Sequence, residues 1–440
     1  MENCELRIEC CRYSGAVHIY CSGIGGIGLS AYAALMRSFG HTVSGSDRTE
    51  SDLMQDLRKQ GIAVSTVQDG SGIPHDCDLF VYTEALSENH PERIAAAARG
   101  IRMLSYFAAL GELSAPYVVI AVAGTHGKSS TTGMLAKILV DAGKDPTVVV
   151  GTKLPDLGGR NFRRGKGNIF LLEACEYRRS FHFLSPDIAV VTTVDGDHFD
   201  YFASVDDYRE AFVEFVKKLP AEGAVILHGN DTDVLRMAKQ AEKSIVDADR
   251  EKLPMLSIPG LHMRQNAQLA LAAASHIGID RESALHSLEG YRGAWRRMER
   301  VGSFSGIPVI DDYGHHPREI RATLQAMRER YVKERIVCVF QPHTHDRTVK
   351  LYREFTSAFS DADLVLIPGI YEARREQDAA TVDVVRFAKD IAEHSTVECQ
   401  AFASIADTEK QLRTEILQSG DVLLVMGAGD ITDLARRMTQ

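Results

Sequence analysis

The sequence predicts an α/β protein of three domains, each built on a mostly parallel sheet with crossover helices. Short apolar runs alternate with amphipathic stretches along the whole 440-residue chain, which is the pattern of strand–helix–strand units. Two glycine-rich loops, at residues 23–28 and 124–129, each follow an apolar run and precede a helical pattern. Breaks near residues 110–116 and 302–307 each precede a new strand–helix series, so the chain divides into three sections.

The apolar runs are predicted to be buried parallel strands, because they are short, rich in valine and isoleucine and separated by helical patterns. They include residues 17–21, 79–83, 117–123, 169–172, 188–194, 224–228, 336–341, 364–368 and 422–426. With the two breaks, they predict a Rossmann-like domain at residues 1–111, a P-loop domain at 112–302 and a doubly wound domain at 303–440.

The composition is that of an ordinary globular protein, with 45% hydrophobic and 25% charged residues. A formal net charge of -10 argues against nucleic acid as a partner, since proteins that bind it carry a basic face. No apolar run approaches the roughly 20 residues of a membrane span, and the N-terminus lacks a signal-peptide pattern. We therefore expect a cytoplasmic protein without a membrane partner, and either a monomer or a homodimer fits the sequence.

The eight cysteines form no C-x-x-C pair. We expect them to be reduced, as is usual in the cytoplasm. A zinc site built from Cys4, Cys10 and Cys11 stays open, although their spacing is not that of the common zinc motifs.

The first glycine loop has the sequence G-I-G-G-I-G and lies between a predicted strand and a predicted helix. Glycines there allow a tight turn and the close approach of a phosphate to the helix N-terminus. Asp47 ends the next predicted strand, where an acidic residue can meet a ribose. A nicotinamide or flavin dinucleotide, the diphosphate of a UDP-sugar, and a tight turn without a ligand all stay open. The glycines are Gly23, Gly25, Gly26 and Gly28.

The second glycine loop, G-T-H-G-K-S-S, predicts a bound nucleoside triphosphate. Backbone amides of such a loop cradle the phosphates, Lys128 can reach the β- and γ-phosphates, and the Ser129 hydroxyl can bind Mg²⁺. The loop is shorter than the full Walker spacing, since Val122 stands where that spacing needs glycine. We therefore expect ATP and Mg²⁺ in a central P-loop ATPase domain. The residues are Gly124, Thr125, His126, Gly127, Lys128, Ser129 and Ser130.

The presence of two phosphate loops in one chain reduces the number of enzyme classes that fit the sequence. A dehydrogenase does not need the second loop, and a simple ATPase does not need the first. A ligase that uses ATP to activate a nucleotide-linked substrate needs both. Glu173 ends the predicted strand at residues 169–172, where its carboxylate can reach a Mg²⁺ ion held by Ser129.

These motifs resemble those of the Mur ligase family, in its alanine-adding branch. The second loop resembles the family's G-T-[HN]-G-K-[TS] sequence, and residues 23–30, G-I-G-G-I-G-L-S, resemble the branch's first loop. The other matching segments follow in order along nearly the whole chain. They are residues 172–174, 197–201, 259–262 with Asn266, 296–299, 311–317 (D-D-Y-G-H-H-P), 340–343 (F-Q-P-H), 371–374 and 427–430.

The resemblance implies an ATP-dependent ligase of peptidoglycan precursor synthesis. In that reaction L-alanine is joined to the carboxylate of UDP-N-acetylmuramate through an acyl phosphate, with ATP and Mg²⁺ as cofactors. The implied architecture is a UDP-substrate domain, an ATPase domain and a C-terminal domain that closes over ATP and carries the amino acid. This agrees with the three sections predicted from the apolar pattern.

The resemblance also implies individual roles. Ser129 and Glu173 would hold Mg²⁺, His198 would bind a second metal ion, and Lys128 would act on the phosphates. His262 and Asn266 resemble the adenine-contacting pair, although Met263 stands where the family often has asparagine. Arg297 and Asp312 resemble contacts to the ATP phosphates and ribose, whereas we expect Arg296 to form a surface salt bridge.

The amino-acid pocket is implied to lie around Tyr313, His315, His343, Thr344 and Arg347. Either His315 or His343 could assist deprotonation of the amine, and the sequence does not decide between them. Thr344 stands where the branch usually has arginine, and Cys175 stands where the family usually has aspartate. These departures bear on amino-acid specificity more than on ATP binding.

Three alternatives stay open. A murein-peptide recycling ligase would attach a whole peptide to the same UDP-sugar. A catalytically inactive, nucleotide-binding regulator would fit if the departures at Cys175 and Thr344 abolish turnover. A nicotinamide oxidoreductase would leave the loop at residues 124–129 unexplained.

Overall fold

A computed structural model describes residues 15–198, 201–371 and 381–440. Cys4, Cys10 and Cys11, and parts of the predicted motifs at residues 197–201 and 371–374, lie outside the described residues. The chain forms two compact units. Unit 1 is Met1–Pro254 with Asn266–Tyr291, and unit 2 is Met255–Gln265 with Arg292–Gln440.

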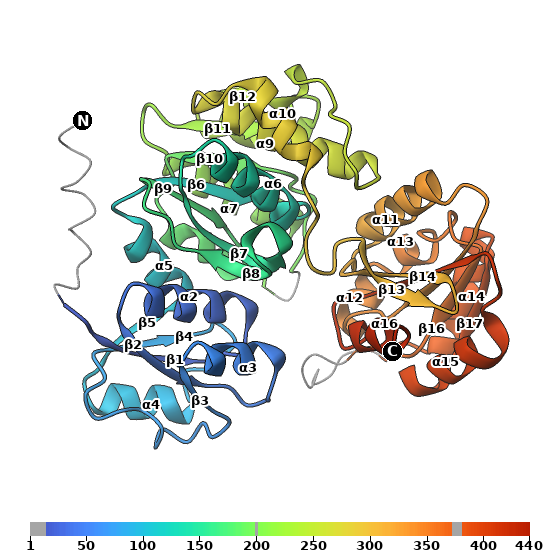
Figure 1. Cartoon of the computed structure of the whole chain (residues 1–440), viewed down its shortest axis with the longest axis horizontal. Helices are drawn as coiled ribbons and strands as arrows, with labels where there is room; N and C mark the ends of the chain where they lie inside the picture. Colours follow the sequence, from blue (N-terminus) through green and yellow to red (C-terminus); the bar gives the residue numbers. More distant parts are fainter. Residues whose placement is uncertain (1–14, 199–200, 372–380) are drawn as a thin grey trace. The chain divides into compact units, whose positions relative to one another are not determined.

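The first sheet of unit 1 has five parallel strands in the order β3-β2-β1-β4-β5 (Figure 1). Sequential strands wind outward from β1 in both directions, so the loop after β1 lies at the switch point of the sheet, a usual place for ligands. The strands are β1 (His18–Ser22), β2 (Thr42–Ser46), β3 (Ala63–Ser65), β4 (Leu79–Tyr82) and β5 (Arg102–Ser105). The helices are α2 (Ile27–Ser38), α3 (Asp52–Lys59), α4 (Pro91–Ala98) and α5 (Tyr106–Ser114).

The second sheet of unit 1 has seven strands in the order β12-β11-β10-β6-β9-β7-β8, and only the β7–β8 pair is antiparallel. The strands are β6 (Val118–Ala123), β7 (Thr147–Leu154), β8 (Arg160–Arg163), β9 (Ile169–Glu173), β10 (Ile188–Val191), β11 (Ala224–Leu227) and β12 (Ser244–Asp247). The helices are α6 (Lys128–Asp141), α7 (Val205–Lys217), α8 (Thr232–Gln240), α9 (Leu261–His276), of which residues 261–265 belong to unit 2, and α10 (Arg281–Glu289). Short 3₁₀ turns cover Pro155–Leu157, Tyr177–Phe183 and Ala248–Arg250.

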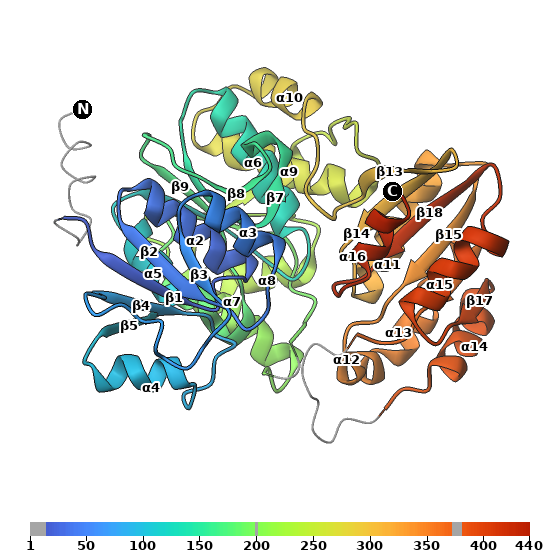
Figure 2. The same ribbon diagram turned by 60° about the horizontal axis from the view of Figure 1, so that its bottom comes forward.

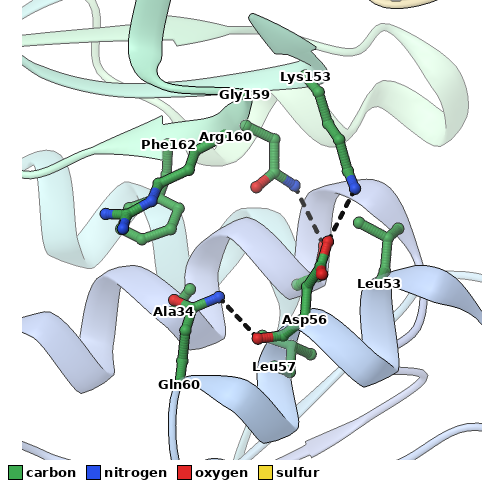
Figure 3. Close-up of a pocket in the computed structure, with 11 residues that line it drawn as sticks. Ala34, Leu53, Asp56, Leu57, Gln60, Lys153, Gly159, Arg160 and Phe162 are labelled. Carbon is green, nitrogen blue, oxygen red and sulfur yellow. Dashed lines mark hydrogen bonds and ion pairs between the residues drawn. The ribbon is translucent and has the colours of Figure 1, made fainter. Parts of the chain in front are cut away.

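The two sheets of unit 1 are joined where α2 packs on β7 and β8, and one hydrophobic core runs through both. Asn161 Nδ2 donates to Ile27 O at 2.6 Å, and Lys153 Nζ lies 2.9 Å from Asp56 Oδ2. A cavity of about 40 Å³ lies beside this ion pair and is lined by Gln60 and Arg160, among others (Figure 3). It holds about one water molecule, so it is too small for a nucleotide.

Unit 2 holds a six-stranded sheet in the order β13-β14-β18-β15-β16-β17, in which only β13 and β14 are antiparallel (Figure 2). Alternate residues of β15 enter separate cores: Ile336 and Cys338 face one, and Val337 and Val339 the other. Helices therefore cover both faces, as a doubly wound sheet requires. The strands are β13 (Glu299–Phe304), β14 (Ile307–Asp312), β15 (Arg335–Phe340), β16 (Leu364–Ile367), β17 (Glu398–Ala401) and β18 (Asp421–Met426). The helices are α11 (Pro317–Arg330), α12 (His345–Lys350), α13 (Tyr352–Thr356), α14 (Val384–Ser395), α15 (Ile405–Gln411) and α16 (Thr432–Arg437), with a π turn at Leu412–Ile416.

The predicted fold class is confirmed, with three mostly parallel sheets and crossover helices. Each apolar run named above lies on a strand of one of these sheets. The predicted boundary after residue 302 falls inside β13, and the exact domain limits stay predictions. Among the described residues, no helix is both long enough and apolar enough to cross a membrane.

Candidate active site

The first glycine loop links β1 to the N-terminus of α2. Gly23 N and Ile24 N both donate to Ser46 O, at 2.8 and 2.9 Å, which ties the loop to the end of β2. Gly23 has a φ of 87°, a conformation that favours glycine. Gly26 caps α2 without a side-chain hydrogen bond, so the amides at this helix end face a position suited to an anion.

Close packing explains two more of these glycines. A side-chain carbon at Gly25 would lie 2.9 Å from Asp47 Oδ2, and one at Gly28 would lie 2.9 Å from the Tyr106 ring. Asp47 Oδ2 accepts a hydrogen bond from Gly25 N at 3.0 Å. The carboxylate predicted to meet a ribose is therefore used to hold the loop itself.

A buried carboxylate, Glu92 of α4, lies beneath the first loop and is fully inaccessible to solvent. It accepts hydrogen bonds from Tyr20 Oη at 2.7 Å, Ser46 Oγ at 2.7 Å and Ser22 Oγ. Burial first, and then the neighbouring Glu92, raises the pKa of Tyr20. This cluster fixes the ends of β1 and β2, from which the loop and Asp47 emerge.

The second glycine loop links β6 to α6. Gly124 has a φ of 137° and Gly127 a φ of 84°, and side-chain carbons there would overlap Thr192 Oγ1 and Asn266 Oδ1 respectively. Gly127 caps α6 without a side-chain hydrogen bond. Free amides at the start of a helix, with a lysine at its first position, form a site for phosphate groups.

The loop is held from behind by buried hydroxyl groups. Thr125 Oγ1 lies 2.8 Å from the hydroxyl of the buried Tyr208, and it accepts from Asp195 N at 3.0 Å. His126 N donates to Thr193 Oγ1 at 3.2 Å, and Thr192 Oγ1 donates to His126 O at 2.5 Å. The β10 end of the sheet therefore fixes the loop conformation.

Ser129 and Glu173, both predicted to bind Mg²⁺, are in contact. Ser129 Oγ donates to Glu173 Oε2 at 2.9 Å, and Gly151 N donates to the same oxygen at 2.9 Å. A hydroxyl and a carboxylate oxygen beside a phosphate loop fit the oxygen preference of Mg²⁺. Within residues 15–198, 201–371 and 381–440, no group of three or more His, Cys, Asp or Glu side chains converges as a metal site.

His198 contacts a different carboxylate, Glu176, which the sequence argument did not select. Its Nε2 lies 3.6 Å from Glu176 Oε1, and Lys128 Nζ lies 3.1 Å from the same oxygen. Burial disfavours both charges, but the pairing outweighs it, so the pKa of Lys128 is raised and that of Glu176 is lowered. Burial, and then Glu176, raises the pKa of Cys175 to about 12, so its thiol stays protonated.

His262 and Asn266, the two residues predicted to contact adenine, lie on α9. Asn266 belongs to unit 1 and packs against Gly127 of the phosphate loop. His262 belongs to unit 2, where burial and then the Arg297 charge lower its pKa to about 4. His262 is therefore neutral near pH 7 and can act as a hydrogen-bond donor and acceptor.

In unit 2, the residues predicted to bind the amino-acid substrate lie close together. The His315 ring lies 5.3 Å from the Tyr313 ring and 5.9 Å from the His343 ring, measured between centroids. His343 stacks on Tyr371 at 5.5 Å, and Arg347 lies with Nη1 3.3 Å from His343 Nδ1. Two imidazoles and a guanidinium thus share one cluster, which suits a zwitterionic amino acid.

Thr344 starts α12 within this cluster with a φ of 69° and a ψ of 144°. A β-branched residue rarely adopts a positive φ, so this backbone is strained by about 1–3 kcal/mol. The Thr344 amide donates to Tyr371 O at 3.0 Å, and its hydroxyl lies 3.5 Å from Arg347 N. The strained turn places Arg347 next to His343.

Two predicted nucleotide contacts of unit 2 have partners within the unit. Asp312 is 4% exposed and accepts hydrogen bonds from Met298 N and Gly314 N, both at 2.8 Å. Burial raises the pKa of Asp312. Arg297 lies 5.2 Å from the centre of the Tyr313 ring. Their roles toward ATP stay predictions.

Arg296 forms a salt bridge, as expected, but the expected surface position is wrong. Its side chain is buried, with 5% of the residue exposed, and it donates to Gly427 O and, at 3.3 Å, to Gly429 O. Its Nε lies 3.7 Å from Asp311 Oδ2. The arginine anchors the loop after β18, a contact across more than 130 residues that sequence spacing cannot reveal.

Comparisons with known proteins agree with this geometry. Three family models match consecutive parts of the chain. They are described as Mur ligase family, catalytic domain (residues 18–118), Mur ligase middle domain (residues 122–253) and Mur ligase, glutamate ligase domain (residues 296–429).

The chain is similar to UDP-N-acetylmuramate–L-alanine ligases over nearly its full length. It is 37% identical to that of Lachnospira eligens, covering 95% of this chain and 97% of that protein. It is 36% identical to that of Acetivibrio thermocellus, covering 94% of each. The solved UDP-N-acetylmuramate–alanine ligase of Thermotoga maritima superposes with a TM-score of 0.79 at 27% identity, covering 96% of this chain and 98% of that one.

Proposed function

Because the chain belongs to the Mur ligase family, we propose that it is an ATP-dependent ligase that joins L-alanine to the carboxylate of UDP-N-acetylmuramate. The observation that carries the proposal is the pair of glycine loops, each ending at a helix N-terminus without a side-chain cap. One loop suits the diphosphate of a UDP-sugar and the other suits ATP. The product would be a precursor of peptidoglycan.

ATP supplies the phosphoryl group that converts the sugar carboxylate into an acyl phosphate. Two anions must approach for this step, so cationic groups have to offset their repulsion. We assign that role to Lys128, to the α6 amides and to Mg²⁺ held by Ser129 and Glu173. The 2.9 Å contact between Ser129 Oγ and Glu173 Oε2 supports the assignment. His198 is proposed for a second metal ion, although imidazole is an unusual ligand for Mg²⁺.

The adenosine part of ATP is assigned to α9 and unit 2. Asn266 packs on the phosphate loop, and His262 is uncharged near neutral pH. We propose that these two residues contact adenine and that Arg297 and Asp312 contribute to the phosphates and ribose. The UDP-sugar is assigned to Gly23, Gly25, Gly26 and Gly28 and to Asp47, whose carboxylate also holds the loop through Gly25 N.

The amine must lose a proton before it attacks the acyl carbon. We propose that the cluster of Tyr313, His315, His343, Thr344 and Arg347 binds L-alanine. Arg347 would take the carboxylate as a bidentate partner. Either His315 or His343 is proposed to accept the proton from the amine. The contact of His315 Nδ1 with Tyr313 O at 3.1 Å does not exclude His315, because a ring that donates through Nδ1 accepts through Nε2.

The proposed substrates are small molecules, and the proposed compartment is the cytoplasm. The cysteines that the structure describes, Cys21, Cys77, Cys175, Cys338 and Cys399, are all free thiols, which suits a reducing compartment.

Isotope transfer tests the proposed chemistry. UDP-N-acetylmuramate labelled with ¹⁸O in its carboxylate is incubated with ATP, Mg²⁺, L-alanine and the enzyme. An acyl phosphate passes one labelled oxygen to inorganic phosphate, so mass spectrometry should find ¹⁸O-phosphate in the same amount as the amide product. Unlabelled phosphate together with amide would contradict this route.

A further inference from the structure

Glu176 follows β9 and contacts Lys128 of the second glycine loop, and no role has been assigned to it above. Its side chain is 1% exposed, which is unusual for a carboxylate, and the two side chains that it contacts, Lys128 and His198, are both proposed active-site residues. Lys128 approaches from the start of α6 and His198 from the segment after β10. Lys128 Nζ lies 3.1 Å from both carboxylate oxygens, and Oε1 also faces His198 Nε2 at 3.6 Å.

We propose that Glu176 is a positioning residue of the ligase reaction, which orients Lys128 and His198 together toward the ATP phosphates. The inference rests on the proposed function, because it deepens the ATP-loop assignment made there. Glu176 need not touch the substrate. It acts through the two side chains that it holds.

The contacts of Lys128 explain why its ammonium group needs a carboxylate to direct it. Its Nζ is folded back onto its own loop, where it donates to Gly124 O and, at 3.2 Å, to Thr125 O. An ammonium group has three donors, so a phosphate can replace the two carbonyl contacts while Glu176 keeps the third. Without the carboxylate, only neutral carbonyl groups would direct a flexible lysine side chain.

The backbone of His198 is also held in an uncommon conformation, with a φ of 56°. Its amide donates to Asp197 Oδ1 at 2.7 Å, and its ring lies 4.8 Å from the Tyr177 ring. Tyr177 directly follows Glu176 in the chain, so one short segment supplies an aromatic and an acidic neighbour of the imidazole. A second carboxylate, Asp197, lies with Oδ2 3.9 Å from His198 Nε2. Such a conformation persists only where the surroundings fix it.

Glu176 also carries a negative charge close to where the phosphates would bind, which opposes nucleotide binding. A positioning role therefore predicts that kcat and the Kd of nucleotide respond differently. Removing the charge should lower kcat, because Lys128 and His198 lose their orientation. It should not raise the Kd of nucleotide, because an unfavourable charge is removed at the same time. A general disruption of the loop would weaken both.

The test compares wild type with Glu176→Gln, Glu176→Asp and Glu214→Gln. Glu214 is a matched control, since it is paired with Arg179 of the same 3₁₀ segment but is about half exposed. Kinetics with UDP-N-acetylmuramate, ATP and L-alanine give kcat, and calorimetry with a non-hydrolysable ATP analogue and Mg²⁺ gives Kd. All measurements are made well below each melting temperature, because Glu176→Gln leaves a buried lysine without its counter-ion.

We expect kcat of Glu176→Gln to fall by about tenfold or more, with Kd of the analogue unchanged or lower, and Glu214→Gln to match wild type. Glu176→Asp should recover the melting temperature but only part of kcat, because the shorter side chain cannot reach both partners. Combined with His198→Asn, the Glu176→Gln change should cost less than it does alone.

Two results overturn the inference. One is a folded Glu176→Gln enzyme with kcat within about twofold of wild type, and the other is a rise in Kd that matches the fall in kcat. Absence of turnover in wild type and Glu214→Gln alike would overturn the proposed function and this inference with it. Turnover in wild type with an unaffected Glu176→Gln variant overturns this inference alone.

Discussion

Lys128 connects the structure to catalysis most directly at the scale of single residues. We expect Lys128→Ala to abolish phosphate release while UDP-N-acetylmuramate still binds, because the first glycine loop belongs to a different sheet. The change removes the ammonium partner of the buried Glu176 carboxylate, and breaking a buried ion pair costs about 3–5 kcal/mol, so a lower melting temperature is part of the expected result. Calorimetry with UDP-N-acetylmuramate at low temperature measures the binding. Loss of binding in a folded variant would contradict the assignment of two separate loops.

Glu173 gives a second residue-scale prediction, which concerns Mg²⁺. Glu173→Gln keeps the shape and one oxygen but loses the charge that favours a divalent cation, so we expect a much lower rate and a higher Mg²⁺ requirement. A magnesium titration of phosphate release measures both, with the exposed Glu222→Gln as control. A variant with normal rates at low Mg²⁺ would show that Glu173 is only a strand-end carboxylate.

Residues that belong to compact motifs could be identified from the sequence, whereas those defined by long-range contacts could not. The loop at residues 124–130 has a spacing with a physical reason, so its geometry could be predicted. Glu92 could not be found, since its partner Tyr20 is 72 positions away. Glu176 did carry a signal, because it lies three residues after Glu173 and directly after Cys175, where the sequence departs from the family's usual aspartate.

At the scale of elements, α9 carries His262, whose protonation should make the free energy of unfolding depend on pH. Burial and the Arg297 charge lower the pKa of His262 to about 4, from about 6.5 in the unfolded chain. The unfolded state then binds a proton that the folded state does not, so stability is lost as pH falls from 6.5 toward 4. We expect the free energy of unfolding of His262→Gln to change less with pH in this range. Denaturant unfolding of both proteins between pH 7 and 4.5 measures it, and parallel curves would contradict the burial of a neutral His262.

The start of α12 gives the prediction on amino-acid affinity. Thr344 offers no charge, so Arg347, one helical turn further on, is the cation proposed for the L-alanine carboxylate. We expect Thr344→Arg to lower KM for L-alanine with little change in kcat, because a second guanidinium strengthens uniform binding. Arg347→Lys should raise KM, since an ammonium cannot make the bidentate contact. Steady-state kinetics with varied L-alanine measure both KM values. An unchanged KM in both variants would show that the L-alanine carboxylate does not bind in this cluster.

Elements were predictable where burial sets a clear pattern. Strands such as β6 and β15 are almost wholly apolar and were found from this alone. The short strand β8, with the sequence R-N-F-R, has no such pattern and was missed, although it packs against α2. Its strand conformation comes from pairing with β7, which is a tertiary effect.

At the scale of the whole molecule, the three predicted sections became three sheets but only two compact units. The first two sheets share one hydrophobic core and are joined through α2 and the β7–β8 hairpin. A sequence shows where each sheet begins, because its strands and glycine loops are local. It does not show which sheets share a core, because that depends on residues far apart in the chain.

The proposed ligase couples ATP cleavage to the joining of UDP-N-acetylmuramate and one small amino acid. Glycine and L-serine should be accepted weakly, because a single methyl group changes discrimination by only about 1–3 kcal/mol. The most direct test is phosphate release from ATP and Mg²⁺ with each substrate omitted in turn, across a panel of single amino acids and short peptides. We predict release only when both UDP-N-acetylmuramate and an amino acid are present, fastest with L-alanine. Release without the UDP-sugar, or a clear preference for a tripeptide over L-alanine, would contradict the account.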